Sequence, residues 1–467
     1  MPKTTSVWEC QNCGSQFPKW AGKCPECGKW NSLVETPISQ TVPAVSNRYQ
    51  TGVEPQAAVD WKKVSGSEKL HIPTAIVELN RVLGGGLVPG GVSLIAGEPG
   101  IGKSTLLSQL ALNIENVLYI NGEESSPQVA NRLRRLQPKS QAKITLLADT
   151  NIDSVVGRIK RGLGLVVVDS IQVMYSSELR SAPGSIGQIR ECALKLINAA
   201  KSMEVPVMLV GHFTKSGEVA GPKLLEHMVD AVLVLEGERS GNFRMLRAVK
   251  NRFGAVDEVG LFAMNDGGMR EVTNPGELLI GDTAGKLPGS VLGCVLEGQR
   301  PLVLEIQALT VPSKLPLPRR VGHGINEHRL QLLCAVIEKH LGLGVGEKDV
   351  FVNVAGGLRS QDPGLDLAVV AAIISSANGR TKDKGRRTKE IRERQLPAFS
   401  SSSLSLGVED LQPSAFSLIF CGEVGLLGEV RQVQGWDRRE KEVGRLQLGK
   451  LVGSNQIKTI TKLQEYL

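Results

Sequence analysis

The chain has 467 residues, which at roughly 150 residues per domain predicts about three domains. Hydrophobic residues make up 41% and charged residues 22% of it, a globular composition that excludes a wholly disordered or fibrous chain. The longest apolar run, around residues 367–374, is far shorter than the roughly 18 residues of a membrane span. The first residues have neither a signal-peptide nor a transit-peptide composition, so we expect a cytoplasmic protein without membrane attachment.

Low aromatic content and abundant glycine indicate the fold class. Aromatic residues make up only 4% of the chain, and glycine occurs 52 times. This composition favours α/β layers punctuated by glycine turns. The net charge of +8 permits a polyanionic partner but does not require one.

Four cysteines near the amino terminus form two C-x2-C pairs separated by ten residues. Four thiolates at this spacing match the needs of a tetrahedral zinc ion. Two disulfides are the alternative, which a reducing cytosol disfavours. We therefore predict a C4 zinc ribbon over residues 1–34 that folds only with its metal. Its predicted ligands are Cys10, Cys13, Cys24 and Cys27.

Aromatic residues lie between these ligands. Phe17, Trp20 and Trp30 could stack on nucleic-acid bases or form the small core of the ribbon, and the sequence leaves both open. Residues 35–60 are rich in Pro, Ser, Thr, Gln and Val without periodicity, which predicts a flexible linker. The remaining cysteines lack a metal-like spacing and are predicted to be buried structural thiols: Cys192, Cys294, Cys334 and Cys421.

The strongest motif follows a short apolar strand at residues 92–96. It has the pattern G-x-x-x-x-G-K-S and precedes the apolar pattern of a helix, which is the strand–loop–helix context of a P-loop. In such a loop backbone amides surround the phosphates, Lys103 neutralises them and Ser104 ligates Mg²⁺. The predicted ATP-binding residues are Gly97, Glu98, Pro99, Gly100, Ile101, Gly102, Lys103, Ser104 and Thr105.

An acidic residue ends the continuous apolar run at residues 165–168. A P-loop needs an acidic metal partner at the end of a neighbouring buried strand. Asp169 is therefore the predicted Walker B residue and reaches Mg²⁺ through water. An aspartate that only caps a following helix is the alternative.

A third strand is predicted at residues 116–120 and ends in Asn-Gly-Glu-Glu-Ser. A carboxylate just past a strand end beside the P-loop strand lies where a general base for water would lie. Glu123 and Glu124 are both candidates, and the sequence does not choose between them. One of the two could instead cap the helix that begins near Ser126.

Further strands are predicted at residues 205–210 and 230–235, with a hairpin partner at 243–250. Strands that alternate with helices in this way build an open, mostly parallel sheet. The sequence therefore predicts an α/β fold with a P-loop ATPase domain over residues 61–275.

Taken in order, these motifs resemble the bacterial RadA family of DNA repair proteins, also called Sms. The resemblance covers most of the chain and rests on the C4 ribbon, the P-loop and four short strings. Those strings are Gly-Glu-Glu-Ser at 122–125, Asp-Ser-Ile-Gln at 169–172, Gly-His-Phe-Thr-Lys at 211–215 and Lys-Asn-Arg-Phe-Gly at 250–254. The resemblance implies a RecA-like ATPase core, followed by a domain similar to that of Lon proteases over residues 285–467.

Two cations of the last string carry a separate prediction. Lys250 and Arg252 lie two residues apart at a strand end, so they point the same way before a glycine turn. A solvated hairpin edge is the plain interpretation. The resemblance implies instead that both act in catalysis, by contacting ATP bound to a neighbouring subunit, or contact DNA.

The resemblance also implies that the loops at residues 174–187 and 212–223 line a central channel. Both are rich in Gly and Ser and carry few acids. The predicted DNA contacts are Arg180, Lys215 and Lys223, with ordinary surface loops as the alternative. His212 is placed to sense the γ-phosphate, or is a buried polar residue.

The carboxyl-terminal third differs from Lon-type peptidases at the position of the nucleophile, and from the family pattern by an inserted segment. Lon-type peptidases carry a serine nucleophile where this chain has Leu365-Asp366-Leu367, so we expect no Ser-Lys proteolysis. We predict instead that the domain is a scaffold that closes the ring of subunits implied by the resemblance. Residues 377–412 are predicted to be a disordered insertion, because residues 380–394 hold eight Lys or Arg against three acids. Incidental nucleic-acid contact is the alternative for this segment.

The resemblance implies an ATP-driven motor of recombinational DNA repair that uses ATP, Mg²⁺ and Zn²⁺. It would form a homo-oligomeric ring, expected to be a hexamer, and bind single-stranded and branched DNA. It would promote branch migration together with a RecA-type recombinase. Two alternatives remain: a Lon-type ATP-dependent protease, disfavoured by the missing serine, and a RecA-like signalling ATPase that does not use DNA.

Overall fold

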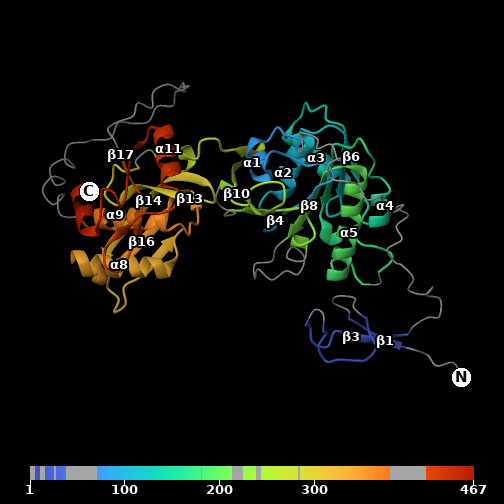
Figure 1. Ribbon diagram of the computed structural model, residues 1–467, viewed down its shortest axis with the longest axis horizontal. Helices are drawn as coiled ribbons and strands as arrows, with labels where there is room; N and C mark the ends of the chain where they lie inside the picture. Colours follow the sequence, from blue (N-terminus) through green and yellow to red (C-terminus); the bar gives the residue numbers. More distant parts are fainter. Residues whose placement is uncertain are drawn as a thin grey trace, which may run out of the picture. The chain divides into compact units, whose positions relative to one another are not determined.

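The computed structural model describes residues 6–10, 16–25, 28–37, 71–179, 181–212, 225–237, 243–281, 284–378 and 417–467 (Figure 1). The chain divides into two compact units. Unit 1 comprises Met1–Glu236, Leu246–Val256 and Met264–Glu271, and unit 2 comprises Gly237–Met245, Asp257–Ala263 and Val272–Leu467. Most of the predicted linker and of the predicted insertion lies outside the described residues.

The amino-terminal module is a three-stranded antiparallel sheet in the order β2-β1-β3. Its strands are β1 (Ser6–Cys10), β2 (Gln16–Phe17) and β3 (Leu33–Pro37). Cys10, Cys24 and Leu33 are buried together, and Phe17 packs against them. So small a core is consistent with a module whose folding depends on a metal.

A nine-stranded sheet follows, in the order β12-β11-β10-β9-β4-β8-β7-β5-β6. The six strands from β9 to β6 in this order are parallel, which confirms the predicted mostly parallel sheet. The strands are β4 (Val92–Gly97), β5 (Val117–Asn121), β6 (Ile144–Leu147), β7 (Leu165–Asp169), β8 (Val207–His212), β9 (Ala231–Glu236), β10 (Phe243–Asn251), β11 (Val259–Asn265) and β12 (Gly268–Glu271).

The helices of unit 1 cover the buried central strands. They are α1 (Val77–Leu83), α2 (Lys103–Leu112), α3 (Ser126–Leu136), α4 (Ile152–Val156) and α5 (Ile186–Met203), with a 3₁₀ turn η2 (Ile171–Val173). Helix α5 begins at Ser185, whose hydroxyl accepts the N–H of Gln188, and buries an apolar face against the core beneath β4, β7 and β8. Because these strands are parallel, their carboxyl ends meet at one edge of the sheet.

Unit 2 contains a mixed six-stranded sheet in the order β15-β16-β14-β13-β17-β20 and a β18–β19 pair. The strands are β13 (Ser290–Glu297), β14 (Arg300–Pro312), β15 (Arg320–His323), β16 (Lys348–Val354), β17 (Ser417–Phe420), β18 (Glu423–Val424), β19 (Val430–Arg431) and β20 (Gly449–Val452).

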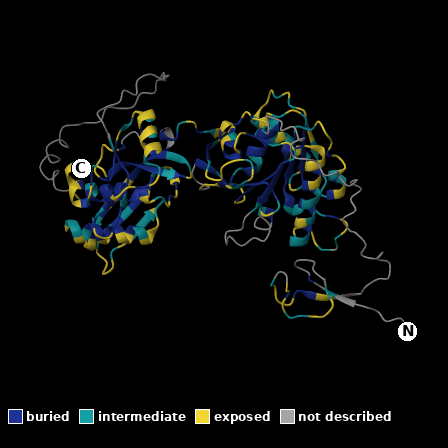
Figure 2. Cartoon of the chain, viewed as in Figure 1, coloured by how far each residue is buried: buried dark blue, intermediate teal, exposed yellow. Residues whose placement is uncertain are grey.

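The helices of unit 2 are α7 (Gly276–Leu279), α8 (Glu327–Leu341), α9 (Asp366–Asn378) and α11 (Trp436–Leu446), with 3₁₀ turns η3 (Val345–Glu347), η4 (Ala355–Gly357), η5 (Pro363–Leu365) and η6 (Ile460–Tyr466). Helix α9 is buried from Asp366 to Ile374 and forms the centre of the unit (Figure 2). It continues through Asn378 and so includes the first two residues of the expected insertion.

The four cysteines predicted to be structural are all buried thiols. Burial raises the pKa of Cys192 to about 12 and that of Cys334 to about 11, so these groups stay protonated and unreactive at neutral pH. Within the described parts of the chain, no helix is both long and apolar enough to cross a membrane.

Candidate active site

The P-loop lies between β4 and α2, as the sequence predicts. Gly100 has φ 80° and Gly102, at the start of α2, has φ 115°, conformations that residues with a Cβ rarely adopt. No atom lies within 4 Å of the position where a Cβ of Gly100 would be. The loop therefore combines an open backbone with the positive end of a helix, the arrangement that binds a phosphate group.

Lys103 lies inside this loop and is only 3% exposed. Its ammonium group donates hydrogen bonds to the carbonyl oxygens of Gly97 at 2.9 Å and Glu98 at 3.0 Å. Burial lowers the pKa of Lys103 to about 8, against the opposing effect of the Asp169 and Glu123 carboxylates. The lysine is thus held by the backbone of its own loop, within electrostatic reach of Asp169 and Glu123.

Asp169 ends β7 beside the end of β5, where Asn121 is its register partner. Its side chain is buried, and its Oδ2 accepts a hydrogen bond from the hydroxyl of Tyr119 at 2.8 Å. Burial, followed by the negative charge of Asp169, raises the pKa of Tyr119, so its hydroxyl remains a donor. Tyr119 of the neighbouring strand β5 therefore orients the Asp169 carboxylate through its Oδ2 atom.

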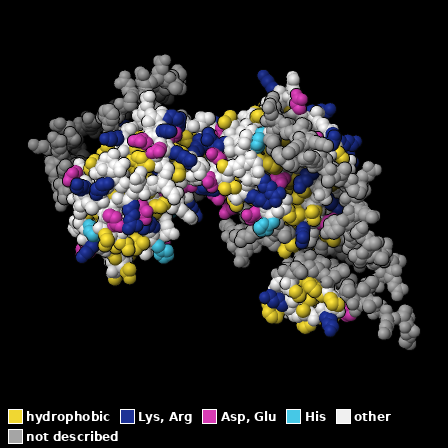
Figure 3. Space-filling model, viewed as in Figure 1, with side chains coloured by type: hydrophobic (Ala, Val, Ile, Leu, Met, Phe, Trp, Pro, Cys, Tyr) yellow, Lys and Arg dark blue, Asp and Glu magenta, His cyan; other side chains and the backbone are white. Residues whose placement is uncertain are grey.

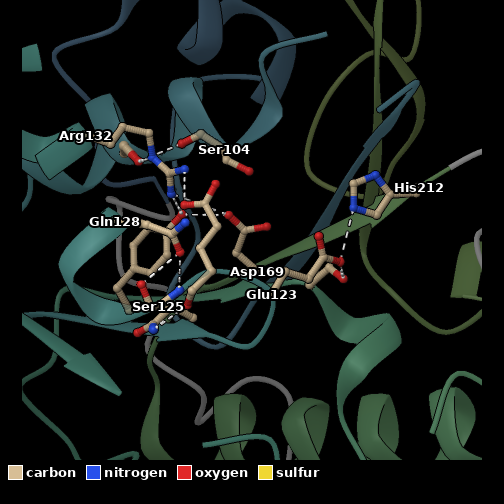
Figure 4. Close-up of polar contacts among 12 residues, drawn as sticks. Ser104, Glu123, Ser125, Gln128, Arg132, Asp169 and His212 are labelled. Atoms are coloured by element: carbon tan, nitrogen blue, oxygen red, sulfur yellow. Dashed lines mark hydrogen bonds and ion pairs between the residues drawn. The ribbon is translucent and has the colours of Figure 1, made fainter. Parts of the chain in front are cut away.

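The two adjacent glutamates have different partners, and Figure 4 shows Glu123 beside His212. Glu123 accepts a hydrogen bond from the hydroxyl of Ser170, and its Oε1 lies 3.3 Å from Nε2 of His212. The hydrogen bond to His212 is the largest cause that lowers the pKa of Glu123. Glu124 instead faces Arg132, whose Nη1 lies 2.5 Å from Glu124 Oε2. Only Glu123 of the pair also acts electrostatically on Lys103.

Neither glutamate caps helix α3, which settles one of the open alternatives. Ser125 is the cap, and it forms a capping box with Gln128, whose Oε1 accepts the N–H and the hydroxyl of Ser125 at 2.8 Å each. Neither carboxylate is therefore used to cap the helix.

Arg132 is a residue of this site that the sequence analysis missed. It lies on α3 and its side chain is 11% exposed. Its guanidinium donates to Ser108 Oγ at 2.9 Å and Tyr119 Oη at 3.2 Å, and lies 3.8 Å from Asp169 Oδ2. Arg132 thereby joins Glu124 to Asp169 and to helix α2. Its position three residues after Val129, the buried residue of α3, places it on the inward face of the helix and could have identified it from the sequence.

His212 ends β8 on the other side of Glu123. Its backbone carbonyl accepts a hydrogen bond from Gln172 at 3.2 Å. Its Nδ1 is buried and has no hydrogen-bond partner among the described residues. A buried ring nitrogen without a partner is uncommon in a folded protein. The residues that follow, including Lys215 and Lys223, lie outside the described residues, as does Arg180 of the other predicted DNA loop.

The described part of that other loop is held in place from α5. The Gln188 side chain is buried, accepts the N–H of Ser176 at 2.7 Å and donates to the carbonyls of Leu179 and Ser181. A single side chain, that of Gln188, therefore holds the described residues that precede and follow residue 180.

The two cations near the end of β10 bond within their own chain. The ammonium of Lys250 donates to the carbonyls of Glu226 at 2.6 Å and Val229 at 2.9 Å, and burial lowers its pKa. Arg252 pairs with Asp230 at 3.1 Å while its side chain stays 52% exposed. These contacts fit a hairpin edge, and the exposure of Arg252 leaves it accessible to a partner.

Two of the four predicted zinc ligands lie in the described part of the amino-terminal module. Cys10 and Cys24 are both buried in its core, whereas Cys13 and Cys27 lie outside the described residues. Ser32 lies beside Cys10, with 3.2 Å between its Oγ and the sulfur. Buried thiol groups in so small a core are suited to zinc.

Unit 2 has a cavity of about 830 Å³ at the start of α9. Asp366 occupies this position and accepts from the guanidinium of Arg329 and from the N–H of Val424 at 3.1 Å. Burial raises the pKa of Asp366, against the effect of Arg329. The residue next to the cavity is thus a paired carboxylate in the place where the Lon resemblance would put a nucleophile.

The parallel sheet, the P-loop and the acidic residues at the sheet edge define a P-loop ATPase of the RecA-like class. Residues 69–218 match the family described as AAA domain, and residues 8–35 match the family described as rubredoxin metal binding domain. Both matches agree with the predicted ATPase core and zinc ribbon.

The chain belongs to the RadA family of DNA repair proteins. It is 42% identical to a DNA repair protein RadA of Pseudomonas aeruginosa over 95% of this chain and 92% of that protein. It is 41% identical to one of Bacillus subtilis over 97% and 93%, respectively. A crystal structure of the RadB recombinase aligns with 42% of this chain and 98% of that one, at 23% identity and a TM-score of 0.36. The resemblance inferred from the motifs is confirmed.

Proposed function

We propose that the protein is a DNA-dependent ATPase of recombinational DNA repair. The observation that carries this proposal is the convergence of Lys103, Glu123 and Asp169 at one sheet edge, in a chain of the RadA family. We further propose that it works as a ring-shaped motor in the cytoplasm, expected to be a hexamer. That ring would bind single-stranded and branched DNA and promote branch migration with a RecA-type recombinase.

The proposed chemistry assigns one role to each side chain. Lys103 turns from the two loop carbonyls to the β- and γ-phosphates of ATP. Glu123 accepts the proton of the attacking water, since it lies near Lys103 and is oriented by Ser170 and His212. Glu124 is held away from that role by Arg132.

Ser104 and Asp169 have the oxygen donors that Mg²⁺ prefers. Asp169 uses Oδ2 for Tyr119 and Arg132, and its other carboxylate oxygen carries no hydrogen bond from a described residue. The ion, when bound there, would neutralise charge on the phosphates. Zn²⁺ would occupy the ribbon, with Cys10, Cys13, Cys24 and Cys27 as ligands.

Lys250 and Arg252 are proposed to act across a subunit boundary of the ring, where cations stabilise the charge of phosphoryl transfer. Arg180, Lys215 and Lys223 are proposed to contact DNA. The Lon-like region is proposed to be a scaffold without peptidase activity.

The deciding experiment compares ATP hydrolysis by the purified chain without DNA, with single-stranded DNA and with branched DNA. We expect DNA to stimulate turnover and Lys103→Ala to abolish it while the chain stays folded by circular dichroism. A rate of ATP hydrolysis that DNA does not change, together with no gel shift, would favour the signalling ATPase. Metal analysis should give about one zinc per chain, sharply reduced by Cys10→Ser.

A further inference from the structure

Two tryptophans on the amino-terminal module are unusually accessible. Trp20 is 55% exposed and Trp30 is 70% exposed, whereas Phe17 packs against the module's core. The sequence left stacking on bases and core formation equally open for all three residues. The structure separates them, because Phe17 belongs to the core and the two indoles do not.

Both indoles border one glycine. A Cβ built on Gly22 would lie 3.6 Å from Cη2 of Trp20 and 3.7 Å from Cζ3 of Trp30. The backbone around them is fixed, since the N–H of Asn31 donates to the Gly22 carbonyl at 2.8 Å and Lys23 forms a β-bridge with Trp30. The two rings are therefore neighbours on one ordered surface, with no side chain on the glycine between them.

Basic residues accompany these rings along the chain. The ammonium of Lys23 lies 5.9 Å from the centre of the Trp30 ring, and Lys19 and Lys29 are exposed. Among the described side chains of residues 17–35, Glu35 is the only acid. Figure 3 shows hydrophobic and basic side chains together on this module.

We infer that Trp20 and Trp30 form a stacking platform for the bases of single-stranded DNA. Accessible aromatic faces next to cations are how proteins hold single strands without reading their sequence, because every base has a π-face and every phosphate a charge. The three lysines favour a polyanion as the partner. A protein partner would normally bury the rings within an apolar surface that holds few charged residues. The inference deepens the proposed function and rests on its DNA-binding part.

The test uses the zinc-loaded full chain and a fluorescein-labelled oligo(dT), with binding followed by anisotropy. W20L/W30L keeps apolar bulk but removes the stacking rings, and W20F/W30F keeps a ring at both positions. We expect the leucine variant to bind about tenfold more weakly and the phenylalanine variant to recover most of the loss. Val34→Ala, an exposed apolar residue of the same module, should bind as the wild type does.

A second ligand identifies the interaction. Wild-type protein should bind an abasic oligonucleotide of the same length about as weakly as the leucine variant binds oligo(dT), and the variant should not distinguish the two. Equal oligo(dT) binding by wild type and W20L/W30L would overturn the platform while leaving the DNA-dependent ATPase intact. So would a leucine variant that binds DNA normally but no longer associates with the recombinase. Wild-type protein that binds no single-stranded DNA would overturn the proposed function itself.

Discussion

Each unit buries an arginine against carboxylates, and the surroundings of the two arginines differ. In unit 2, Arg439 is 1% exposed and its Nη1 donates to Asp362 at 2.7 Å and to the carbonyl of Cys294 at 2.7 Å. Asp362 in turn accepts the N–H groups of Leu296 and Gly364. Both charges are thus compensated by protein groups, as expected for a cluster that only stabilises the fold.

In unit 1, Arg132 contacts Glu124 and Asp169 and also donates hydrogen bonds to Ser108 and Tyr119. Nearby, Oδ1 of Asn121 and Nδ1 of His212 are buried and have no partner among the described residues. Unsatisfied polar groups are costly and persist where a ligand or water completes the network. The comparison teaches that a buried arginine–carboxylate pair does not by itself mark a functional site; the pair of unit 1 is distinguished by its position beside buried polar atoms without partners among the described residues.

The largest predicted effect is the loss of the unit 2 cluster. Arg439→Ala leaves the Asp362 carboxylate buried without its cation and should lower the free energy of unfolding by about 3–5 kcal/mol. Arg445→Ala on the same helix removes a pair whose arginine is 54% exposed and should cost at most about 1 kcal/mol. Urea unfolding followed by circular dichroism measures both, and equal losses would remove the distinction between a compensated cluster and a surface pair.

The next largest effect separates the two glutamates of unit 1. Glu123→Gln removes the proposed base and should lower kcat for ATP at least about 100-fold with little change in KM. Glu124→Gln keeps a hydrogen-bond acceptor for Arg132 and should lower kcat about tenfold or less. Steady-state hydrolysis with saturating single-stranded DNA gives both values, and the reverse order would make Glu124 the base.

A smaller effect is expected at Arg132. Arg132→Ala frees Glu124 and loosens Asp169, so kcat should fall about tenfold with the fold retained. Arg132→Lys keeps the charge but loses the forked donors and should recover only part of the rate. Arg135→Ala, an exposed arginine on the same helix, is the matched control and should behave as wild type. Loss of rate in the control would assign the effect to helix α3 as a whole.

The sequence could predict the parts of unit 1 that depend on local patterns. The apolar runs gave the central strands, and the glycine spacing gave the P-loop around Lys103. The sequence could not distinguish the roles of Glu123 and Glu124. The two adjacent side chains contact different partners, His212 and Arg132 respectively. Such partners come from distant segments, which pattern alone does not bring together.

Arg132 was missed for a related reason. It is one of three arginines within four residues of α3, and such a run usually forms a solvated helix face. Only the sheet-edge position of Tyr119 and Asp169 makes one of the three a part of the site. In unit 2 the same limitation hid Arg439, whose partners Asp362 and Cys294 lie far from it in the chain.

The smallest predicted effect concerns pH and again contrasts the two units. The pKa of Lys103 is lowered to about 8, so the ammonium that ATP needs is lost as pH rises through that value. Between pH 7.5 and 8.5 the protonated fraction falls about threefold, and KM for ATP should rise by about the same factor. Lys103→Arg keeps its charge and should show no such rise in nucleotide binding. Arg439 does not titrate in this range, so the stability contribution of its cluster should stay constant. A flat KM in the wild-type protein would show that Lys103 keeps an ordinary pKa and that burial in the P-loop is offset by its two acidic neighbours.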